Sequence, residues 1–196
     1  MLEKEQSTLS ELLLGIAPFS ASELEQAQCL FSIRRFSAKD RLFSAGEVNK
    51  DLYFVTEGFG RYFYIDPEGH EKNKMLVRKG GLFASATSIV GGKPSPYYAQ
   101  ALIDCTTVSI AYPELVKLSL EHQHWNVFLR TLLERVLLGM ERRKAALLML
   151  GAKERYLEFL EEFGGDAQAI SLRQVAMYVG ITDVSLSRIR KELGLT

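Results

Sequence analysis

The sequence predicts an α+β fold in which a β-rich domain is flanked by helices, and three observations support this class. Short runs rich in Phe, Tyr, Val and Ile, punctuated by Gly, Asp and Pro, fill residues 31–111. Apolar residues at helical spacing precede these runs and return from Pro113 to about Phe163. Two short helices with a glycine between them are indicated near the C-terminus. Because no long helices separate the strand-like runs, they favour a barrel, sandwich or jelly roll over a parallel sheet.

The bulk composition is that of a globular protein. The 196 residues allow one large domain, or one medium and one small domain. No apolar run approaches the roughly 20 residues that cross a bilayer, and Met1–Glu5 lack the features of a secretory signal. We therefore expect a cytoplasmic protein with no membrane partner. Cys29 and Cys105 lie far apart in apolar surroundings, which predicts two buried thiols, with no metal and no cofactor.

The chain up to about Leu30 is predicted to be helical. One apolar stripe supports the first helix: Leu9, Leu12, Leu13 and Ile16. Pro18 ends this helix, and Ser20 or Ser22 can cap a second, shorter one.

Strands and turns alternate through the β-rich segment. The strand-like runs are Phe31–Phe36, Leu52–Thr56, Gly60–Ile65, Asn73–Val77, Tyr97–Leu102 and Thr106–Ala111. The turns between them contain Ala45–Glu47, Glu57–Gly58, Asp66–Gly69 and Lys79–Gly81.

A long helix is predicted from about Glu121 to Leu150, and it would measure roughly 45 Å at 1.5 Å per residue. Its apolar residues follow the spacing of a coiled-coil seam: Trp125, Leu129, Leu132 and Val136. Continuing the seam reaches Gly139 and Arg143, where the pattern weakens. We expect the helix to join two copies of the chain, and the alternative is a helix packed wholly against its own β domain.

The pattern that carries most functional information spans Ser171 to Leu193 and is typical of a helix-turn-helix. Ser171, with Gln174 three residues later, predicts a capping box at the start of the first helix. Gly180 suits a left-handed helix end, and Thr182 suits the N-cap of the second helix. The apolar and small positions agree with two crossing helices: Val175, Ala176, Val179, Ile181, Leu186, Ile189 and Leu193. An ordinary helical hairpin is the alternative.

Such a pair of helices would allow the second helix to lie in the major groove of DNA. Arg188 is expected to donate two hydrogen bonds to a guanine edge. Phosphate contacts are expected from Thr182, Ser185, Arg190 and Lys191. The complete set of candidate DNA-binding residues is Ser171, Arg173, Thr182, Asp183, Val184, Ser185, Ser187, Arg188 and Lys191.

A formal net charge of +0 does not exclude a nucleic-acid partner, because a sum over the whole chain averages over its domains. The segment from residue 171 to the end is modestly basic. It contains Arg173, Arg188, Arg190 and Lys191 against Asp183 and Glu192.

The order of a β domain, a long helix and a helix-turn-helix resembles the Crp/Fnr family of transcription regulators, over nearly the whole chain. Asp51–Arg61 are similar to the family's β-roll hairpin, and Leu42–Glu47 to the turn before it. The resemblance implies a cyclic-nucleotide-binding-like β-roll (a jelly-roll-like double-stranded β-helix), a dimerising helix and a DNA-binding domain. It also implies double-stranded DNA as a partner, and RNA polymerase as a further one. The positions that match the family's DNA-facing residues are Thr182, Asp183, Val184, Ser187 and Arg188.

The region that would hold a cyclic nucleotide departs from the family's pattern. Cyclic-nucleotide-binding members hold the ribose and the cyclic phosphate with a Gly-Glu pair and a later Arg-Ser pair. Here no glutamate follows Gly81, and Ser95-Pro96 stand where the arginine and its neighbour would be. We therefore predict that cyclic AMP is not the effector. The tentative pocket, which either holds an apolar or aromatic effector or is filled by its own side chains, comprises Gly81, Leu82, Phe83, Ala84, Ser85, Ser95, Tyr97 and Tyr98.

Other departures shape the functional expectation. Only Gly-Leu-Thr follow Leu193, so the β-hairpin wing that usually follows the recognition helix is expected to be missing. Iron–sulfur and haem sensing find no support in two cysteines and in His70, His122 and His124, which suit surface positions. No enzyme motif is recognisable. The expected function is a dimeric DNA-binding regulator, and the alternative is a small-molecule sensor module that has lost useful DNA affinity. The expected domains are 1–120 (sensor), 121–150 (dimerisation helix) and 151–196 (DNA-binding).

Overall fold

The computed structural model describes residues 3–195, with side chains described from Leu9 onwards. Met1, Leu2 and Thr196, on which the expectations for the chain ends partly depend, lie outside the described residues. The chain divides into two compact units, residues 1–62 with 76–136, and residues 63–75 with 137–196. This division falls inside the long helix, whereas the sequence suggested boundaries on either side of that helix.

The N-terminal segment forms α1 (Glu3–Leu14), α2 (Ala21–Ala27) and the 3₁₀ helix η1 (Gln28–Leu30). Ser20 is the N-cap of α2, which decides between the two serines considered above. The Ser20 side chain accepts a hydrogen bond from the Glu23 backbone N–H, and the Glu23 carboxylate accepts one from the Ser20 backbone N–H at 2.8 Å. This reciprocal pair is a capping box, which satisfies two backbone donors that the helix itself cannot.

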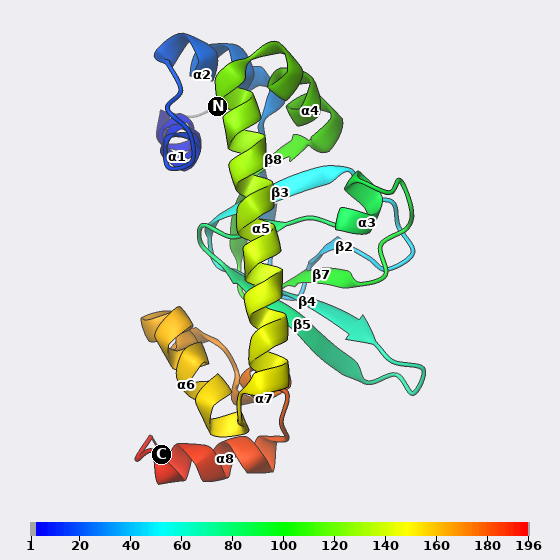
Figure 1. The fold of residues 1–196 in the computed structure, drawn as a ribbon, viewed down its shortest axis with the longest axis vertical. Helices are drawn as coiled ribbons and strands as arrows, with labels where there is room; N and C mark the ends of the chain where they lie inside the picture. The colour runs from blue at the N-terminus through cyan, green and yellow to red at the C-terminus, as the bar shows by residue number, and fades with distance from the viewer. Residues whose placement is uncertain (1–2, 196) are drawn as a thin grey trace. The chain divides into compact units, whose positions relative to one another are not determined.

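Two four-stranded sheets form the β domain (Figure 1). The first sheet has the order β1-β8-β3-β6 and the second β2-β7-β4-β5. The strands are β1 (Ser32–Phe36), β2 (Arg41–Phe43), β3 (Asp51–Glu57), β4 (Phe59–Ile65), β5 (Glu71–Arg78), β6 (Leu82–Phe83), β7 (Tyr98–Ala101) and β8 (Cys105–Ala111). Each predicted run contains a strand. The two shortest strands, β2 and β6, and the one-turn helix α3 (Ala86–Ile89) have too few residues to show a periodic pattern, and the sequence analysis missed them.

The turn between β3 and β4 shows why glycine is required there. Gly58 has a φ of 91°, and a Cβ atom at this position would lie 2.2 Å from the Asp104 carbonyl oxygen. Gly60, inside β4, is equally constrained, because its Cβ would lie 2.5 Å from the Phe83 ring. The backbone of β4 therefore approaches its neighbours closely only because these positions lack side chains.

The segment after β8 forms two helices, α4 (Tyr112–Glu121) and α5 (Gln123–Met149). The break lies at His122, whose backbone is extended. The long helix predicted from about Glu121 to Leu150 is confirmed, since α5 runs through Gly139 for 27 residues without interruption. Figure 1 shows α5 as one long helix, and its first half contributes Trp125, Phe128 and Leu132 to the core of the first unit.

This burial changes the interpretation of the predicted seam. Trp125 is 1% exposed and Leu132 6% exposed within the single chain. Trp125 packs against Phe19 and Phe31, with ring centroids 4.4 and 6.0 Å apart. These two seam residues therefore belong to the chain's own core, and the seam as predicted is not an open surface at these positions. Leu129 is half-buried and Val136 is exposed.

The C-terminal part of the second unit is helical. It consists of α6 (Ala152–Phe163), the 3₁₀ helix η2 (Gly164–Ala169), α7 (Leu172–Val179) and α8 (Asp183–Glu192). Its core is aromatic, because the rings of Tyr156, Phe159, Phe163 and Tyr178 pack with neighbouring centroids 4.9 to 6.1 Å apart. Gly151 separates α5 from α6, directly after Leu150, where the long helix was predicted to end.

The two thiols differ from the expectation of two buried cysteines. Cys105 is buried, and burial raises the pKa of its thiol to about 11. Cys29 is exposed, because it lies in the short η1 helix and not on a strand or helix face that packs. Within the described residues, no helix is long and apolar enough to span a membrane.

Candidate nucleic-acid interface

Local sequence signals set the geometry of α7 and α8. The Ser171 hydroxyl accepts a hydrogen bond from the Gln174 N–H, which starts α7 at the predicted residue. Gly180 ends it in the left-handed conformation, with φ 78° and ψ 41°. The N–H groups of Gly180 and Ile181 both donate to the Ala176 carbonyl, at 2.9 and 3.0 Å. The chain therefore leaves α7 in a tight turn at Gly180 and begins α8 three residues later, as the glycine predicted.

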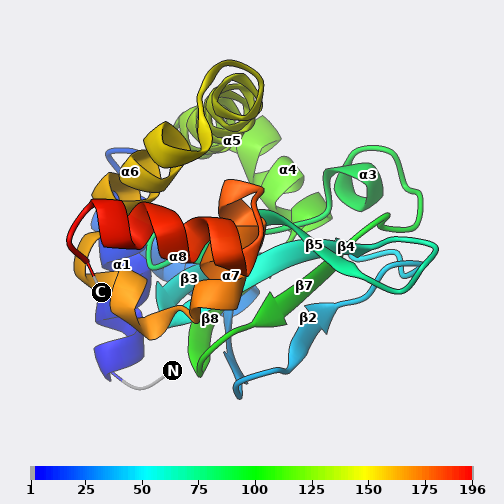
Figure 2. The ribbon, with the colours of Figure 1, turned by 90° about the horizontal axis from the view of Figure 1, so that it is seen from below.

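Thr182 begins α8. Its side chain accepts a hydrogen bond from the Ser185 N–H, and the two hydroxyls lie 2.9 Å apart. Leu186 and Ile189 are buried, so one face of α8 is fixed against the rest of the unit. Figure 2 shows α8 in red beside α7 in orange. The caps and the buried face fix the helix, which leaves its other side to solvent.

The exposed side of α8 carries most of the predicted DNA-binding residues. Those that are exposed are Thr182, Asp183, Val184, Ser187, Arg188 and Lys191. Ser185 is half-buried, which agrees with its role at the cap. Val184, Ser187, Arg188 and Lys191 follow the spacing i, i+3, i+4, i+7, so the structure brings them onto one helical face. Ser171 and Arg173, at the start of α7, are also exposed.

Arg190 does not match the expectation of a phosphate contact. Its guanidinium donates to the Tyr156 hydroxyl at 3.0 Å and to the Leu195 carbonyl at 2.7 Å. Arg190 therefore ties the last turn of α8 to α6 and is held by the chain itself. Sequence spacing alone could not separate this arginine from Arg188, because Tyr156, one of the two partners of Arg190, is 34 residues away in the sequence.

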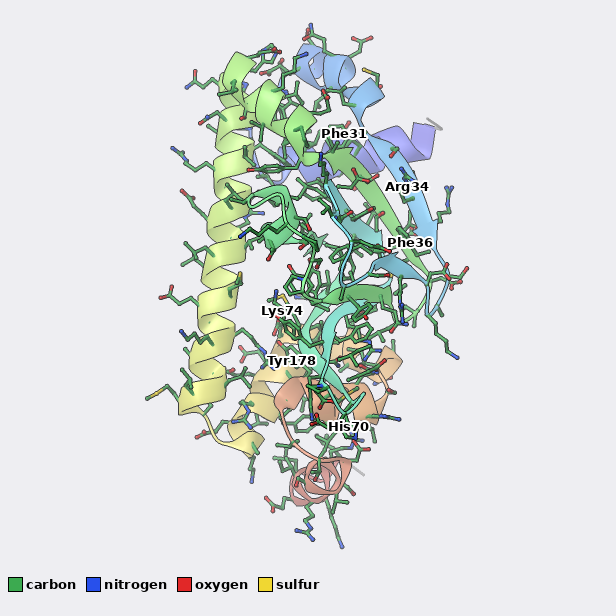
Figure 3. The ribbon with its side chains drawn as sticks, turned by 90° about the vertical axis from the view of Figure 1, so that its right-hand side faces the viewer. Phe31, Arg34, Phe36, His70, Lys74 and Tyr178 are labelled. Carbon is green, nitrogen blue, oxygen red and sulfur yellow. The ribbon has the colours of Figure 1, made fainter. Side chains whose placement is uncertain are left out.

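Two arginines that the sequence analysis did not assign hold the C-terminal end of α7. Arg143 places its guanidinium 4.0 Å from the centroid of the Tyr178 ring (labelled in Figure 3), and it donates to the Tyr178 carbonyl. Arg155 donates to the Val179 carbonyl at 2.7 Å. Terminal helix carbonyls have no partners within the helix and carry partial negative charge, so cationic donors suit them. The apolar seam pattern weakens at Arg143 because this side chain binds the C-terminal end of α7 through Tyr178.

A polar contact joins the hairpin at residues 63–75 to α7 within the second unit. The Asn73 amide donates to the Gln174 side-chain oxygen at 2.7 Å and to the Gln174 carbonyl at 3.1 Å. Tyr178, on the same helix, donates to the Glu162 carboxylate at 3.1 Å, and burial raises the pKa of its hydroxyl. The position of α7 therefore depends on residues from three other segments of the chain.

The tentative effector pocket in the β-roll is filled by aromatic rings. Phe43, Tyr62, Phe83 and Tyr97 are all buried. The Tyr62 ring lies 5.1 Å from Phe83 and 5.3 Å from Tyr97, centroid to centroid. These contacts favour the second alternative of the sequence analysis, in which the chain's own side chains occupy the interior. Of the other pocket residues, Gly81 and Leu82 line a different cleft, and Tyr98 lies under the Arg41 guanidinium at 4.8 Å.

Polar groups in this interior are turned toward the chain's own backbone. The Tyr62 hydroxyl accepts from the Ala84 N–H at 2.6 Å and donates toward the Leu82 carbonyl at 2.9 Å. Burial raises the pKa of Tyr62, so the hydroxyl stays neutral. Ser95 donates to the Tyr97 carbonyl at 2.8 Å. By contrast, the buried hydroxyls of Ser85 and Ser88 have no hydrogen-bond partner among the residues that the structure describes.

These residues do not fit a cyclic nucleotide. A buried cyclic phosphate needs a charge-assisted donor, which an arginine fork supplies best. Two hydroxyls in the corresponding segments are those of Ser85 and Ser95, which are neutral and buried. Neutral hydroxyls cannot compensate the desolvation of a phosphate anion. Both the filled interior and the lack of charge in these hydroxyls therefore argue against a bound cyclic nucleotide.

Comparison with known proteins places the fold. Residues 33–122 match the cyclic nucleotide-binding domain family. No curated protein sequence matches the chain. Among solved structures, FixK2 from Bradyrhizobium japonicum is similar with a TM-score of 0.72 at 20% identity, over 84% of each chain. The c-di-GMP-responsive global regulator CLP of Xanthomonas campestris gives 0.68 at 19%, over 89% of this chain and 92% of CLP. The Thermus thermophilus Catabolite Activator Protein gives 0.55 at 21%, over 93% and 86%.

Proposed function

We propose that the chain is a sequence-specific DNA-binding transcription regulator of the Crp/Fnr type, with α8 as its recognition helix. The observation that carries the proposal is the exposed row Val184, Ser187, Arg188 and Lys191 on a helix whose other face is buried and whose start is capped. The likeness to structures of Crp/Fnr-type regulators supports it at the level of the fold.

The chemistry of the row suits a major groove. Arg188 is exposed and can donate two parallel hydrogen bonds to a guanine edge. Val184 is 61% exposed, which is unfavourable for an apolar side chain in water and favourable against a thymine methyl group. Lys191 supplies a positive charge one turn further along and would contact phosphate. The first turn of α8 adds backbone N–H groups and the positive end of the helix dipole.

The start of α7 would contribute to positioning on the backbone of the DNA. Ser171 and Arg173 are exposed there, beside the N–H groups of the first turn. Such contacts fix the register of a protein on DNA without reading its sequence. Arg190 is omitted from the proposed interface, because Tyr156 and the Leu195 carbonyl already hold it.

We propose that the regulator dimerises through α5. The residues that would form the dimer seam differ in part from those predicted from the sequence. Trp125 and Leu132 are used by the chain's own core. Five of the exposed apolar residues of the helix fall at coiled-coil spacing: Leu133, Val136, Leu137, Met140 and Leu147. Exposed apolar rows of this kind are typical of interfaces.

The dimer can be tested by introducing a charge into this row. Leu137 is 66% exposed, so Leu137→Glu should leave the monomer folded and place a carboxylate in the seam. Leu120→Glu, at an 82% exposed position on α4, is the matched control. Analytical ultracentrifugation should show monomers for Leu137→Glu and dimers for the control and wild type. A dimer that survives Leu137→Glu with unchanged affinity would reject this seam.

We further propose that cyclic AMP is not the effector, for the reasons of fit given above. RNA polymerase stays a prediction from the resemblance. The direct test of the function is selection of genomic DNA fragments by the purified full chain at two salt concentrations. A palindromic site with half-sites about one helical turn apart would support a dimeric DNA reader. Weak binding that is blind to sequence would instead support a sensor module without useful DNA affinity.

A further inference from the structure

A cleft of about 720 Å³ opens in the first unit, away from the aromatic interior of the roll. Its walls come from the end of α1, from β1, β3 and β8, from the turn between β5 and β6, and from α5. The volume lies within the roughly 300–1,000 Å³ that is usual for small-molecule sites. Neither the matched family region nor the proposed DNA interface assigns a role to it.

The apolar floor of the cleft is mainly aliphatic, although Phe54, Thr56 and Thr106 also line the cleft. Leu12, Ile16, Ile33 and Leu82 line it, and each is only half-buried, so apolar surface stays in contact with water. Branched aliphatic side chains of this kind offer no hydrogen bond and no flat aromatic face. A flexible aliphatic group would therefore gain most from covering them, because the gain scales with the apolar area removed from water.

The rim of the cleft is charged, with a surplus of cations. Arg35, Lys79 and Arg135 line it from β1, from the β5–β6 turn and from α5, and all three are exposed. Glu11 and Glu57 line it as well. Two carboxylates offset two of the three cations, which leaves one positive charge at the mouth of an aliphatic cleft. The Arg135 guanidinium donates a hydrogen bond to the Gly15 carbonyl oxygen at 3.4 Å, and this contact holds the guanidinium at the rim of the cleft.

We propose that this cleft binds an amphipathic monoanion, a medium-chain carboxylate whose aliphatic chain lies on the leucine and isoleucine floor and whose carboxylate faces Lys79 and Arg135. The single surplus charge matches one carboxylate, and the aliphatic lining residues favour an aliphatic chain. The proposal does not depend on DNA binding. Val136 lines the cleft and also belongs to the exposed row of α5, so the ligand would lie beside the proposed dimer seam.

The test is isothermal titration calorimetry of the full chain with octanoate, decanoate and decan-1-ol. Decanoate should bind once per chain, and more tightly than octanoate by about fourfold for each methylene added. Decan-1-ol should bind about tenfold more weakly than decanoate, since it lacks the charge that the cationic rim attracts. Equal affinity for the alcohol and the carboxylate would overturn the charge assignment, and no saturable binding of decanoate would overturn the site.

Variants locate the binding in the cleft. Lys79→Gln and Arg135→Gln should each weaken decanoate about tenfold, and Ile33→Trp should fill part of the cleft and abolish binding. Lys117→Gln is the matched control, because it removes an exposed cation of the same unit that does not line the cleft. Circular dichroism checks that each variant is folded. Binding that persists in both charge variants contradicts the proposal while leaving the DNA-binding function untouched.

Discussion

The interior of the β-roll and the exposed face of α8 arrange their side chains in opposite ways. In the roll, the rings of Phe43, Tyr62, Phe83 and Tyr97 pack on one another, and the Tyr62 hydroxyl bonds to the backbone at Ala84. On α8, Arg188 and Lys191 extend from a helix that is fixed without them. Aromatic rings that pack on one another, with tyrosine hydroxyls already bonded to the backbone, have little to offer a ligand. A rigid helix with outward donors is suited to a partner that supplies acceptors.

The largest change in stability is expected when a buried aromatic ring is removed from the interior of the β-roll. Phe83 is completely buried, so Phe83→Ala should lower the free energy of unfolding by about 3–5 kcal/mol through lost burial and a residual cavity. Chemical denaturation measures this change. Phe36→Ala, at a half-buried position of β1, is the control and should cost clearly less. A loss of under about 1 kcal/mol for Phe83→Ala would mean that the interior is loosely filled and open to ligands.

The next effect concerns the support of α7. Arg143→Met keeps an unbranched apolar stem and removes both the guanidinium contact with the Tyr178 ring and the hydrogen bond to its carbonyl. We expect a loss of about 2 kcal/mol, since hydrogen bonds to charged groups contribute about 1.5–3 kcal/mol. Arg142→Met, at an exposed neighbouring position, should change little. Equal stability of both variants in thermal denaturation would show that Arg143 does not hold α7.

The smallest effect is a pH dependence at the N-terminal helices. The Ser20 backbone N–H, followed by His124 at 3.0 Å, lowers the pKa of Glu23 from 4.5 to about 2. A carboxyl whose pKa is lower in the folded state stabilises the fold above pH 4.5, and the stabilisation is lost as the pH falls through about 2. Wild type should therefore exceed Glu23→Gln in thermal stability at pH 7.

The difference should shrink between pH 4.5 and about 2, when melting temperatures are compared across this range. Glu25→Gln, at an exposed position on the same helix, is the control and should show no comparable difference. A difference in melting temperature between wild type and Glu23→Gln that stays constant with pH would show that ionisation of the Glu23 carboxylate does not cause it.

The elements that the sequence predicted well are those set by local chemistry. Ser171, Gly180 and Thr182 act on backbone groups within four residues, so their capping roles follow from the chain itself. The long-range contacts could not be predicted in this way. Arg143 and Tyr178 are 35 residues apart, and Asn73 and Gln174 are 101 apart. No local pattern records such pairs.

The predicted seam on the long helix shows the same limit. The spacing of Trp125, Leu129, Leu132 and Val136 identifies an apolar helix face. It does not say whether the chain's own sheet or a second copy covers that face. In the structure Trp125 and Leu132 contact the chain's own core, and the exposed row lies further along the helix. In the same way, the aromatic residues of the tentative pocket could be identified from the sequence. Whether they line an open cavity or fill it could not, because this depends on how their rings pack in three dimensions.

The central claim is that α8 reads DNA, and the most direct measurement compares Arg188→Ala, Lys191→Ala and wild type. Fluorescence anisotropy would follow binding to the selected site and to a scrambled duplex at two salt concentrations. Arg188→Ala should lose about 1–3 kcal/mol on the selected site and little on the scrambled one. Lys191→Ala should weaken both duplexes alike and reduce the salt slope by about 1. Equal losses on both duplexes for both variants, or no loss for either, would contradict the assignment of α8 as the recognition helix.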